Sequence, residues 1–324
     1  MAMPTELELH RLLQAMTSIR PLFVLGAGAS APLVPTIAML RARVMERLRK
    51  ALPIARPVLA RNSLHETVLP PGVTDPAIDP TFIQLLATNG LTRYSLETLV
   101  HTELTPPQLD EAPPNYAIFN LVPPGAGILN YNTDGLATRF CGKRHHVLAV
   151  HGTVDPSFTE ALALHEITQL REFLELTQAF GSNEEFNVRP RTAFLYPEPE
   201  PDGFLGDPQH SPLGGILTSP DAVVIVGYTF GKTEHGFSDA ASYAHFVEVT
   251  RGLQRPLVVV DPSGHDLAGS FGDATENANV TLVPAYWNHL SASILDVVGR
   301  YCLSGLAAVH DYVHVVLRRY DQRL

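Results

Sequence analysis

Six short apolar runs constrain what this chain can fold into. Each contains at least one β-branched residue and is bounded by Gly, Pro, Asn or Asp. They lie at residues 21–28 (PLFVLGAG), 127–131 (GILNY), 146–152 (HVLAVHG), 221–228 (DAVVIVGY), 255–262 (RPLVVVDP) and 279–285 (NVTLVPA). Because the runs are continuously apolar rather than alternating, they predict strands that are buried on both faces, as in parallel sheets covered by helices. The sequence therefore predicts an α/β fold with a doubly wound, mainly parallel sheet.

Helical patterns separate these runs. Apolar residues recur at helical spacing at 36–52, 92–104, 158–180, 236–251 and about 289–319. A strand–helix alternation of this kind is typical of a parallel sheet, because each parallel connection must cross back over the sheet.

Two segments between strands, about 38–116 and 155–220, stand out by their length and their proline-rich loops. We expect one domain over residues 1–324, in which these segments are helical insertions over the carboxyl edge of the sheet. The expected core comprises about 18–37, 117–154 and 221–290, and a C-terminal helix follows at about 289–319.

The charge balance argues against several classes of partner. The chain has 23 Lys and Arg against 33 Asp and Glu, a formal net charge of -10, which repels phosphate backbones and anionic membranes. We therefore expect no direct nucleic-acid binding. The chain has no apolar run of about 18 residues and no secretory signal, so we expect no membrane span and a cytoplasmic location. Cys141 and Cys302 form no CxxC pair, so we expect no zinc site.

Polar residues follow four of the predicted strands directly. The segments are GAGAS at 26–30, NYNTD at 130–134, HG at 151–152 and GYT at 227–229. In an open parallel sheet all carboxyl ends face one edge, where ligands bind, so these polar residues should converge. A buried unpaired amide costs about 1–3 kcal/mol, so polar residues placed here are better explained by a ligand than by stability.

The glycine turn GAGAS is the first of these segments. Its glycines let the backbone approach a pyrophosphate closely, and its amides and the following helix offer donors to an anion. It is not GxGxxG and has no Walker lysine, which disfavours ordinary dehydrogenases and NTPases. The alternative is a tight strand-to-helix turn that needs glycine only for its dihedral angles.

Taken together, these motifs resemble the NAD-binding motifs of the sirtuin family. The likeness lies in GAGAS with VPT shortly after it, NYNTD, a single HG, GYTF and VVVDP, in that order and spacing. More closely, they resemble the bacterial sirtuin-like NAD-consuming proteins of antiphage defence. The resemblance covers strand ends along nearly the whole chain and none of the two insertions. It implies a Rossmann-like sheet, with NAD as the substrate.

The resemblance also implies roles for individual residues. Asn132 would lie against the nicotinamide ribose, Asp134 would bind the amide group of nicotinamide, and His151 would act on the ribose hydroxyls. Asp261 stands where sirtuins usually have an asparagine near the adenosine ribose, and a carboxylate there can accept hydrogen bonds from two hydroxyls. The residues expected to hold or flank the NAD phosphates and the adjoining ribose are Gly26, Ala27, Gly28, Ser30, Gly227, Tyr228 and Thr229.

Departures from the deacylating sirtuins narrow the expected reaction. Residues 155–220 contain no cysteine, whereas those enzymes carry two CxxC pairs there, and APLVPTIAML replaces their GIPDFR-like segment. Breaking the nicotinamide bond develops positive charge on the ribose, which hydrogen-bond acceptors near its hydroxyls stabilise. A histidine can assist there or activate water, and an asparagine can orient that water while remaining neutral. We therefore expect an enzyme that hydrolyses NAD to nicotinamide and ADP-ribose, as an effector of prokaryotic antiviral defence.

Other interpretations remain open at this point. The chain as a whole could be a non-catalytic module that binds NAD or ADP-ribose, or an ADP-ribosyltransferase or deacylase. Asp134 could cap the helix that follows it, and Tyr228 could pack under the sheet. The pair His310 and His314 has the helical spacing of zinc ligands but lacks the glutamate of the protease motif. The apolar C-terminal helix could contact a second copy of the chain or an activating partner.

Overall fold

The computed structural model divides the chain into two compact units. The first comprises Met1–Pro32, Gln108–Val150 and Pro199–Leu324, and the second comprises Leu33–Pro107 and His151–Glu198. The second unit takes up most of the two predicted insertions. Residues 108–116, which we had placed in the first insertion, and residues 199–220, which we had placed in the second, belong to the first unit. The structure describes residues 3–36, 39, 43, 103–104, 106–149, 220–229, 232–233, 236–237, 243, 246–247, 250, 254–262, 276–277 and 279–324.

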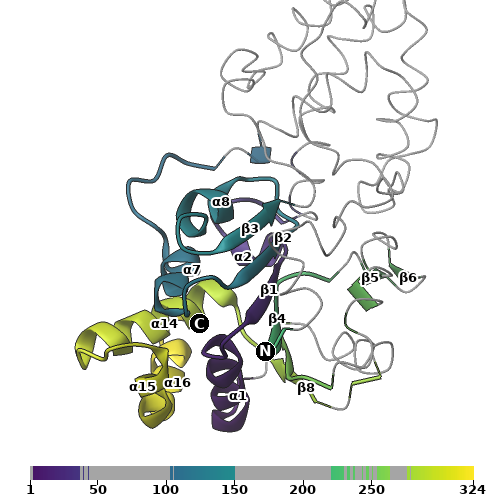
Figure 1. Ribbon diagram of the computed structural model, residues 1–324. Coiled ribbons are helices and arrows are strands. Elements are labelled where there is room, and N and C mark those ends of the chain that lie inside the picture. The colour runs from purple at the N-terminus through teal and green to yellow at the C-terminus, as the bar shows by residue number, and fades with distance from the viewer. Residues whose placement is uncertain are drawn as a thin grey trace, which may run out of the picture. The chain divides into compact units, whose positions relative to one another are not determined.

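The first unit is built on a six-stranded, all-parallel sheet in the order β3-β2-β1-β4-β7-β8 (Figure 1). The strands are β1 Pro21–Leu25, β2 Gly127–Asn130, β3 His146–Ala149, β4 Ala222–Val226, β7 Leu257–Val260 and β8 Val280–Val283. All six predicted strands are therefore confirmed. The strand order reverses between β1 and β4, as in Rossmann-like sheets, whose ligands bind at that reversal.

Both faces of the sheet are covered in the first unit. Leu22 and Val24 lie on one face, in a cluster that includes Phe246 of a helical segment. Phe23 points to the opposite face, where its ring meets that of Phe119 edge-on at 4.9 Å between centroids. This two-sided burial explains why the strand sequences are continuously apolar.

The short pair β5 Lys232–Thr233 and β6 Gly236–Phe237 forms a separate antiparallel sheet. We had predicted that a helix begins at residue 236, so its start was placed too early. Helical residues do occur further on, at 243, 246, 247 and 250.

Helix α1 Glu6–Met16 precedes the sheet and was not among the predicted helices. It begins with a capping box, in which the Glu8 backbone N–H donates to Thr5 Oγ1 (3.2 Å) and the Thr5 backbone N–H donates to Glu8 Oε2 (2.7 Å). Its apolar side, which includes Leu9, Leu12 and Leu13, is fully buried, and the helix contacts β4, β7 and β8.

In the part of the chain that the structure describes, four short helices lie around the first two strands. One follows β1, two precede β2 and one follows β2. They are α2 Ala27–Ser30, α7 Pro114–Ala117, the 3-10 helix η2 Ile118–Leu121 and α8 Leu136–Cys141. Of these, α7 lies beside α14 Trp287–Arg300, the long helix near the C-terminus (Figure 1).

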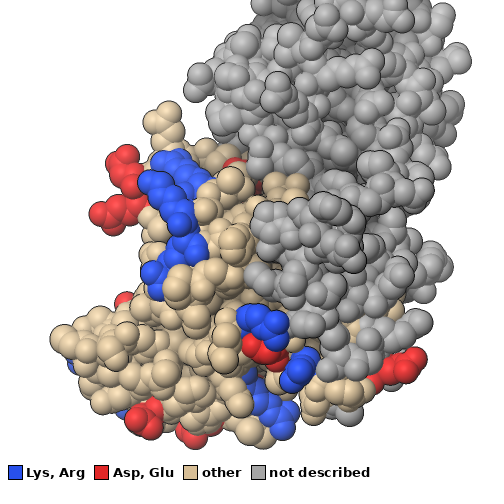
Figure 2. Space-filling view, in the orientation of Figure 1, with Lys and Arg blue, Asp and Glu red and all other residues tan. Residues whose placement is uncertain are grey.

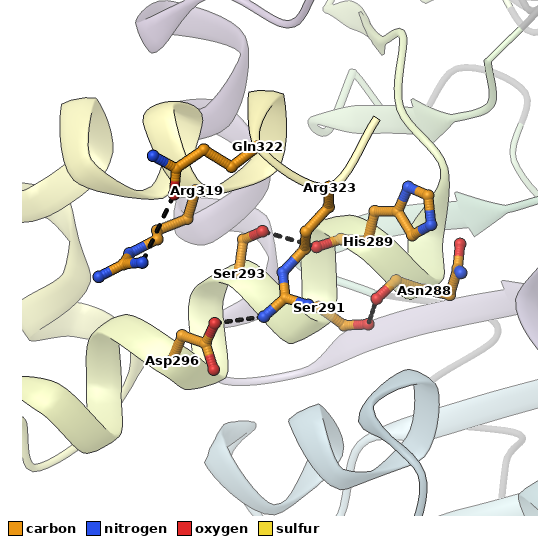
Figure 3. A network of polar contacts seen from close by, with 8 residues as sticks. All are labelled: Asn288, His289, Ser291, Ser293, Asp296, Arg319, Gln322 and Arg323. Atoms are coloured by element: carbon orange, nitrogen blue, oxygen red, sulfur yellow. Dashed lines mark hydrogen bonds and ion pairs between the residues drawn. The ribbon is translucent and has the colours of Figure 1, made fainter.

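The C-terminal segment, which we predicted as one helix, is broken into separate pieces. They are α14 Trp287–Arg300, α15 Leu306–Val309, η3 His310–Tyr312 and α16 Val313–Asp321. The apolar spacing continues through the break, but Cys302 adopts a left-handed backbone with φ of 51° and Gly305 precedes α15. An ion pair between Arg323 and Asp296 then links the chain end after α16 to α14 (Figure 3).

The surface carries charges of both signs. On the face seen in Figure 2, Lys and Arg side chains lie next to Asp and Glu side chains. Arg20, for example, pairs with Asp221 at 3.3 Å. Among the described residues, no helix combines the length and the apolar character needed to cross a membrane.

His310, which we considered as half of a metal-binding pair, instead contacts α1. Its ring stacks on that of His10 with centroids 5.1 Å apart, and the two Nδ1 atoms are 2.8 Å apart. Two Nδ1 atoms at this distance form a hydrogen bond only if one ring is unprotonated there. His314 is exposed, and in the described parts of the chain no three metal-ligating side chains form a group.

We predict that this histidine pair makes stability fall at acidic pH. Burial first, and then the proximity of His10, lower the pKa of His310 from its usual value of 6.5. The unfolded chain therefore takes up this proton at a higher pH than the folded chain does. The stabilisation is complete above the usual pKa of 6.5 and is lost as the pH falls toward the lowered pKa of His310. The melting temperature should drop more steeply between about pH 7 and about pH 5 in the wild-type chain than in His310→Gln. Parallel pH profiles for the two proteins would contradict this assignment.

Candidate functional site

Three strand ends meet at the carboxyl edge of the sheet, beside the reversal of strand order. After β1, the Gly26 N–H donates to the carbonyl of Val226 at the end of β4 (2.9 Å). After β2, the Tyr131 N–H donates to the carbonyl of Leu25 at the end of β1 (2.9 Å). The rings of Tyr131 and Tyr228 stack at 4.3 Å between centroids. The segments after β1, β2 and β4 are therefore in direct contact.

Glycine is required here because two backbones touch. The Gly28 N–H donates to the Gly227 carbonyl (3.0 Å), and a Cβ atom on Gly28 would lie 2.7 Å from the Cα of Gly227. A Cβ atom on Gly26 would lie 2.4 Å from that of Tyr228. Gly26 has φ of -111°, which any residue adopts, so close approach rather than its dihedral angle selects glycine. The amides of Gly26 and Gly28 are both bonded within the protein.

Four buried polar side chains lie behind this turn, and we call them the Ser30 cluster: Ser30, Tyr116, Asn132 and Asp134. None is more than 7% exposed. Ser30 Oγ lies 2.6 Å from Tyr116 Oη, accepts a hydrogen bond from Asn132 Nδ2 (3.1 Å) and donates to Asp134 Oδ2. The cluster thus joins the segments after β1 and β2 to α7 through side-chain hydrogen bonds alone.

Asn115, next to Tyr116 in α7, supports the turn from outside the cluster. Its Nδ2 donates to the carbonyls of Ala29 (2.8 Å) and Ala31 (2.9 Å), at the end of α2. The Trp287 indole N–H, at the start of α14, in turn donates to the Asn115 carbonyl (2.9 Å). The short helix α2 is therefore held by contacts from two other helices.

The Asn132 carboxamide has a defined orientation. Both hydrogens of Nδ2 are used, one by the Gly26 carbonyl (2.7 Å) and one by Ser30 Oγ (3.1 Å). Its backbone is held by Asn130, which accepts from the Asn132 N–H (3.2 Å) and donates to the Asn132 carbonyl (2.9 Å). Oδ1 has no hydrogen-bond partner among the described residues. It is absent from the fully buried polar atoms that lack a partner, so some of its surface is accessible. Asn132 therefore presents a hydrogen-bond acceptor.

Asp134 uses both carboxylate oxygens within the protein. Oδ1 accepts from the backbone N–H of Leu136, the first residue of α8 (2.9 Å), and Oδ2 accepts from Ser30. The N-cap of α8 is Gly135 and has no side chain, so Asp134 does not cap the helix itself but supplies a partner for its first N–H. Burial raises the pKa of Asp134, while the bonds from Ser30 and Leu136 oppose that shift. The direct contact of Asp134 with nicotinamide stays a prediction.

Tyr116 keeps its proton at neutral pH. Burial, and then the adjacent Asp134, raise the pKa of the Tyr116 phenol well above its usual value. Sequence reasoning did not find this residue or Asn115, because both come from PNYA, a short helix distant along the chain from Ser30. The only available signal was the pair of polar residues, Asn and Tyr, between prolines and an apolar stretch.

The other predicted residues fall into three groups. Asp261 follows β7, is 7% exposed, and its backbone N–H donates to the Val283 carbonyl (3.2 Å). Ala27 and Thr229 are half-buried; Ala27 lies between Gly26 and Gly28, and Thr229 lies two residues after Gly227. His151 lies outside the described residues, so its role stays a prediction.

The backbone contact generates a stability prediction. Gly28→Ala should destabilise the chain by about 1–3 kcal/mol, because the added methyl group forces the backbones of Gly28 and Gly227 apart. Gly299→Ala is the matched control, since a Cβ atom there meets nothing within 4 Å, and alanine should stabilise α14 by about 0.5–1 kcal/mol. Urea denaturation of both variants would measure this. Equal effects of the two substitutions would contradict the packing role.

No protein-family model, curated protein or solved structure matches this chain. The function of the site is therefore inferred from its own residues. They provide a glycine-lined contact of two strand ends, one outward-facing amide oxygen and a buried carboxylate held by a serine.

Proposed function

We propose that this protein hydrolyses the nicotinamide glycosidic bond of NAD and yields nicotinamide and ADP-ribose. The observation that carries the proposal is the contact between the glycine turn after β1 and Asn132 after β2, beside the reversal of strand order. Dinucleotides bind at this position in doubly wound sheets. A sirtuin-like fold, with the two long segments inserted over the carboxyl edge, is part of the same proposal.

Asn132 is proposed to act through its free oxygen. In the reaction the bond from the ribose C1′ to the nicotinamide nitrogen breaks, and its electron pair leaves with nicotinamide, which departs neutral. Water adds its oxygen to C1′ and gives up a proton. Asn132 Oδ1 would accept a hydrogen bond from that water or from a ribose hydroxyl, which stabilises the positive charge that develops on the sugar. His151 is proposed to take the proton or to act on the ribose hydroxyls.

The remaining residues are proposed to hold the rest of NAD. Asp261 would accept hydrogen bonds from the adenosine ribose, as a carboxylate can do for two hydroxyls. Ala27 and Thr229 would lie beside the phosphates. Because the amides of Gly26 and Gly28 already bond to carbonyls, these glycines would shape the phosphate site rather than donate to it.

The proposed biological role is that of an effector in prokaryotic antiviral defence. An enzyme that destroys NAD endangers its own cell, so its activity needs a gate. We propose that an activating partner or assembly of several copies supplies that gate. The cytoplasmic location is part of this proposal.

One observation favours a second candidate, a non-catalytic module that binds NAD or ADP-ribose. Asp134 and Ser30 spend their hydrogen bonds within the protein, so only Asn132 Oδ1 of the Ser30 cluster is left for a ligand in the described part of the chain. Such a site can bind a nucleotide without cleaving it. An ADP-ribosyltransferase or deacylase is the third possibility, and it differs from the others in its products.

The proposed reaction predicts that Asn132 is essential and that a matched asparagine is not. Asn132→Ala should lower nicotinamide release from NAD by about 10²-fold or more, because it removes the oxygen that acts on the developing charge. Asn120→Ala, at an exposed position in η2, should retain the wild-type rate. Chromatography of nicotinamide would give both rates, with the protein alone, at rising concentration and with candidate partners.

Three outcomes would reject the proposal in different ways. Binding of NAD by calorimetry without nicotinamide release under any of these conditions would favour the binding module. ADP-ribose attached to protein, or an acyl-ADP-ribose product in mass spectra, would favour the third possibility. Full activity in Asn132→Ala would refute the site assignment.

A further inference from the structure

We infer that Asp134 is a positioning residue that acts through Ser30. By holding Ser30, it determines that the oxygen end of the Asn132 carboxamide, rather than the nitrogen end, faces the ligand. The site then selects a ligand group that donates a hydrogen bond, such as a sugar hydroxyl or a water. The inference rests on the proposed function for the identity of the substrate, which is NAD. It gives Asp134 an indirect role in place of contact with nicotinamide.

The hydrogen count at Ser30 carries the first step. A serine hydroxyl has one hydrogen to donate and two lone pairs to accept with. Ser30 Oγ is within bonding distance of Tyr116 Oη (2.6 Å), Asn132 Nδ2 (3.1 Å) and Asp134 Oδ2. In the contact with Asp134 the hydroxyl of Ser30 is the donor, so its single hydrogen is used there. Both lone pairs of Ser30 then face Tyr116 and Asn132, which must donate.

The second step concerns Asn132. The nitrogen end of its carboxamide faces two acceptors, Ser30 Oγ and the Gly26 carbonyl. Turning the carboxamide over would point Oδ1 at both of them and break two hydrogen bonds at once. As long as Ser30 donates to Asp134, only one orientation of Asn132 is therefore satisfied, and its oxygen faces away from the cluster.

The third step is what an amide at position 134 would do. In Asp134→Asn the oxygen is still needed by the Leu136 N–H, so the new Nδ2 faces Ser30. Ser30 Oγ then accepts from this amide, and its one hydrogen is free to point at Tyr116 Oη or at Asn132. Ser30 can now accept from the nitrogen end of the Asn132 carboxamide or donate to its oxygen end. Only the Gly26 carbonyl still selects the nitrogen end, so Asn132 is held more weakly. Tyr116→Phe differs, because it removes one donor and leaves the link from Asp134 through Ser30 to Asn132 complete.

The first test reads the orientation without reference to activity. The full-length chain is labelled with ¹⁵N-asparagine, and hydrogen exchange of the Asn132 side-chain amide is followed by NMR, with the resonance assigned by its loss in Asn132→Ala. We expect slow exchange in the wild-type protein and in Tyr116→Phe, and exchange at least about tenfold faster in Asp134→Asn, because an unbonded amide exchanges more readily. Unchanged exchange in Asp134→Asn, or equal acceleration in both variants, would overturn the inference.

Ser30→Ala provides a second variant if Asp134→Asn does not fold, as judged by circular dichroism. It removes the hydroxyl that links Asp134 to Asn132 and leaves the carboxylate in place. It should accelerate exchange of the Asn132 amide as well. Slow exchange in Ser30→Ala would show that Ser30 does not hold the carboxamide.

The second test separates positioning from direct contact with the substrate. With NAD, Asp134→Asn should lower kcat by about 10²-fold, as misplaced catalytic groups do, and change KM by less than about threefold. A raised KM with unchanged kcat would instead indicate that Asp134 binds nicotinamide directly, and would overturn the inference. If the wild-type protein releases no nicotinamide, the proposed function fails, whereas the NMR comparison still decides the positioning role.

Discussion

The contact between Gly28 and Gly227 is the constraint on which the rest of the site depends. A Cβ atom on Gly28 would lie 2.7 Å from the Cα of Gly227, and one on Gly227 would lie 2.4 Å from the Cα of Gly28. Here the side chains are absent, so the backbones after β1 and β4 meet and form a hydrogen bond of 3.0 Å. That contact sets the path of the chain into α2 and thereby the position of Ser30. Together with the hydrogen bonds from Asn115 to the end of α2, it fixes Ser30 relative to the strand end that carries Asn132.

Burying four polar side chains behind this turn is costly unless each one is bonded. In the Ser30 cluster the hydroxyls, the amide and the carboxylate satisfy one another, and backbone groups of Gly26 and Leu136 complete the set. Partly satisfied networks are unfavourable in a low-dielectric interior, whereas complete ones fix a single arrangement. Among the described residues, the Ser30 cluster is complete except at Asn132 Oδ1, which is the atom that the proposed function assigns to the ligand.

The sequence allowed the sheet to be predicted well and the polar cluster only in part. Strands such as Ala222–Val226 were readable because burial on both faces leaves an unbroken apolar run. The meeting of Gly26 with Asn132 followed from the rule that parallel strands end at one edge. Tyr116 was not predictable, since its contact with Ser30 depends on how α7 packs. The break near Cys302 was missed because apolar spacing continues across it, and α1 was missed although Thr5 and Glu8 form a recognisable capping box.

Trp287 gives the C-terminal helices a mechanical link to the glycine turn. Its indole N–H donates to the carbonyl of Asn115, and the Asn115 side chain donates to the end of α2, so hydrogen bonds connect α14, α7 and α2 in series. A shift of α14 would be transmitted to the glycine turn through these hydrogen bonds, even though no residue of α14 lies in the Ser30 cluster. A partner that binds the outer side of α14 would therefore act on the strand ends without contacting them. For the same reason, a shortened chain that ends after β8 would lack the outer brace of its own turn.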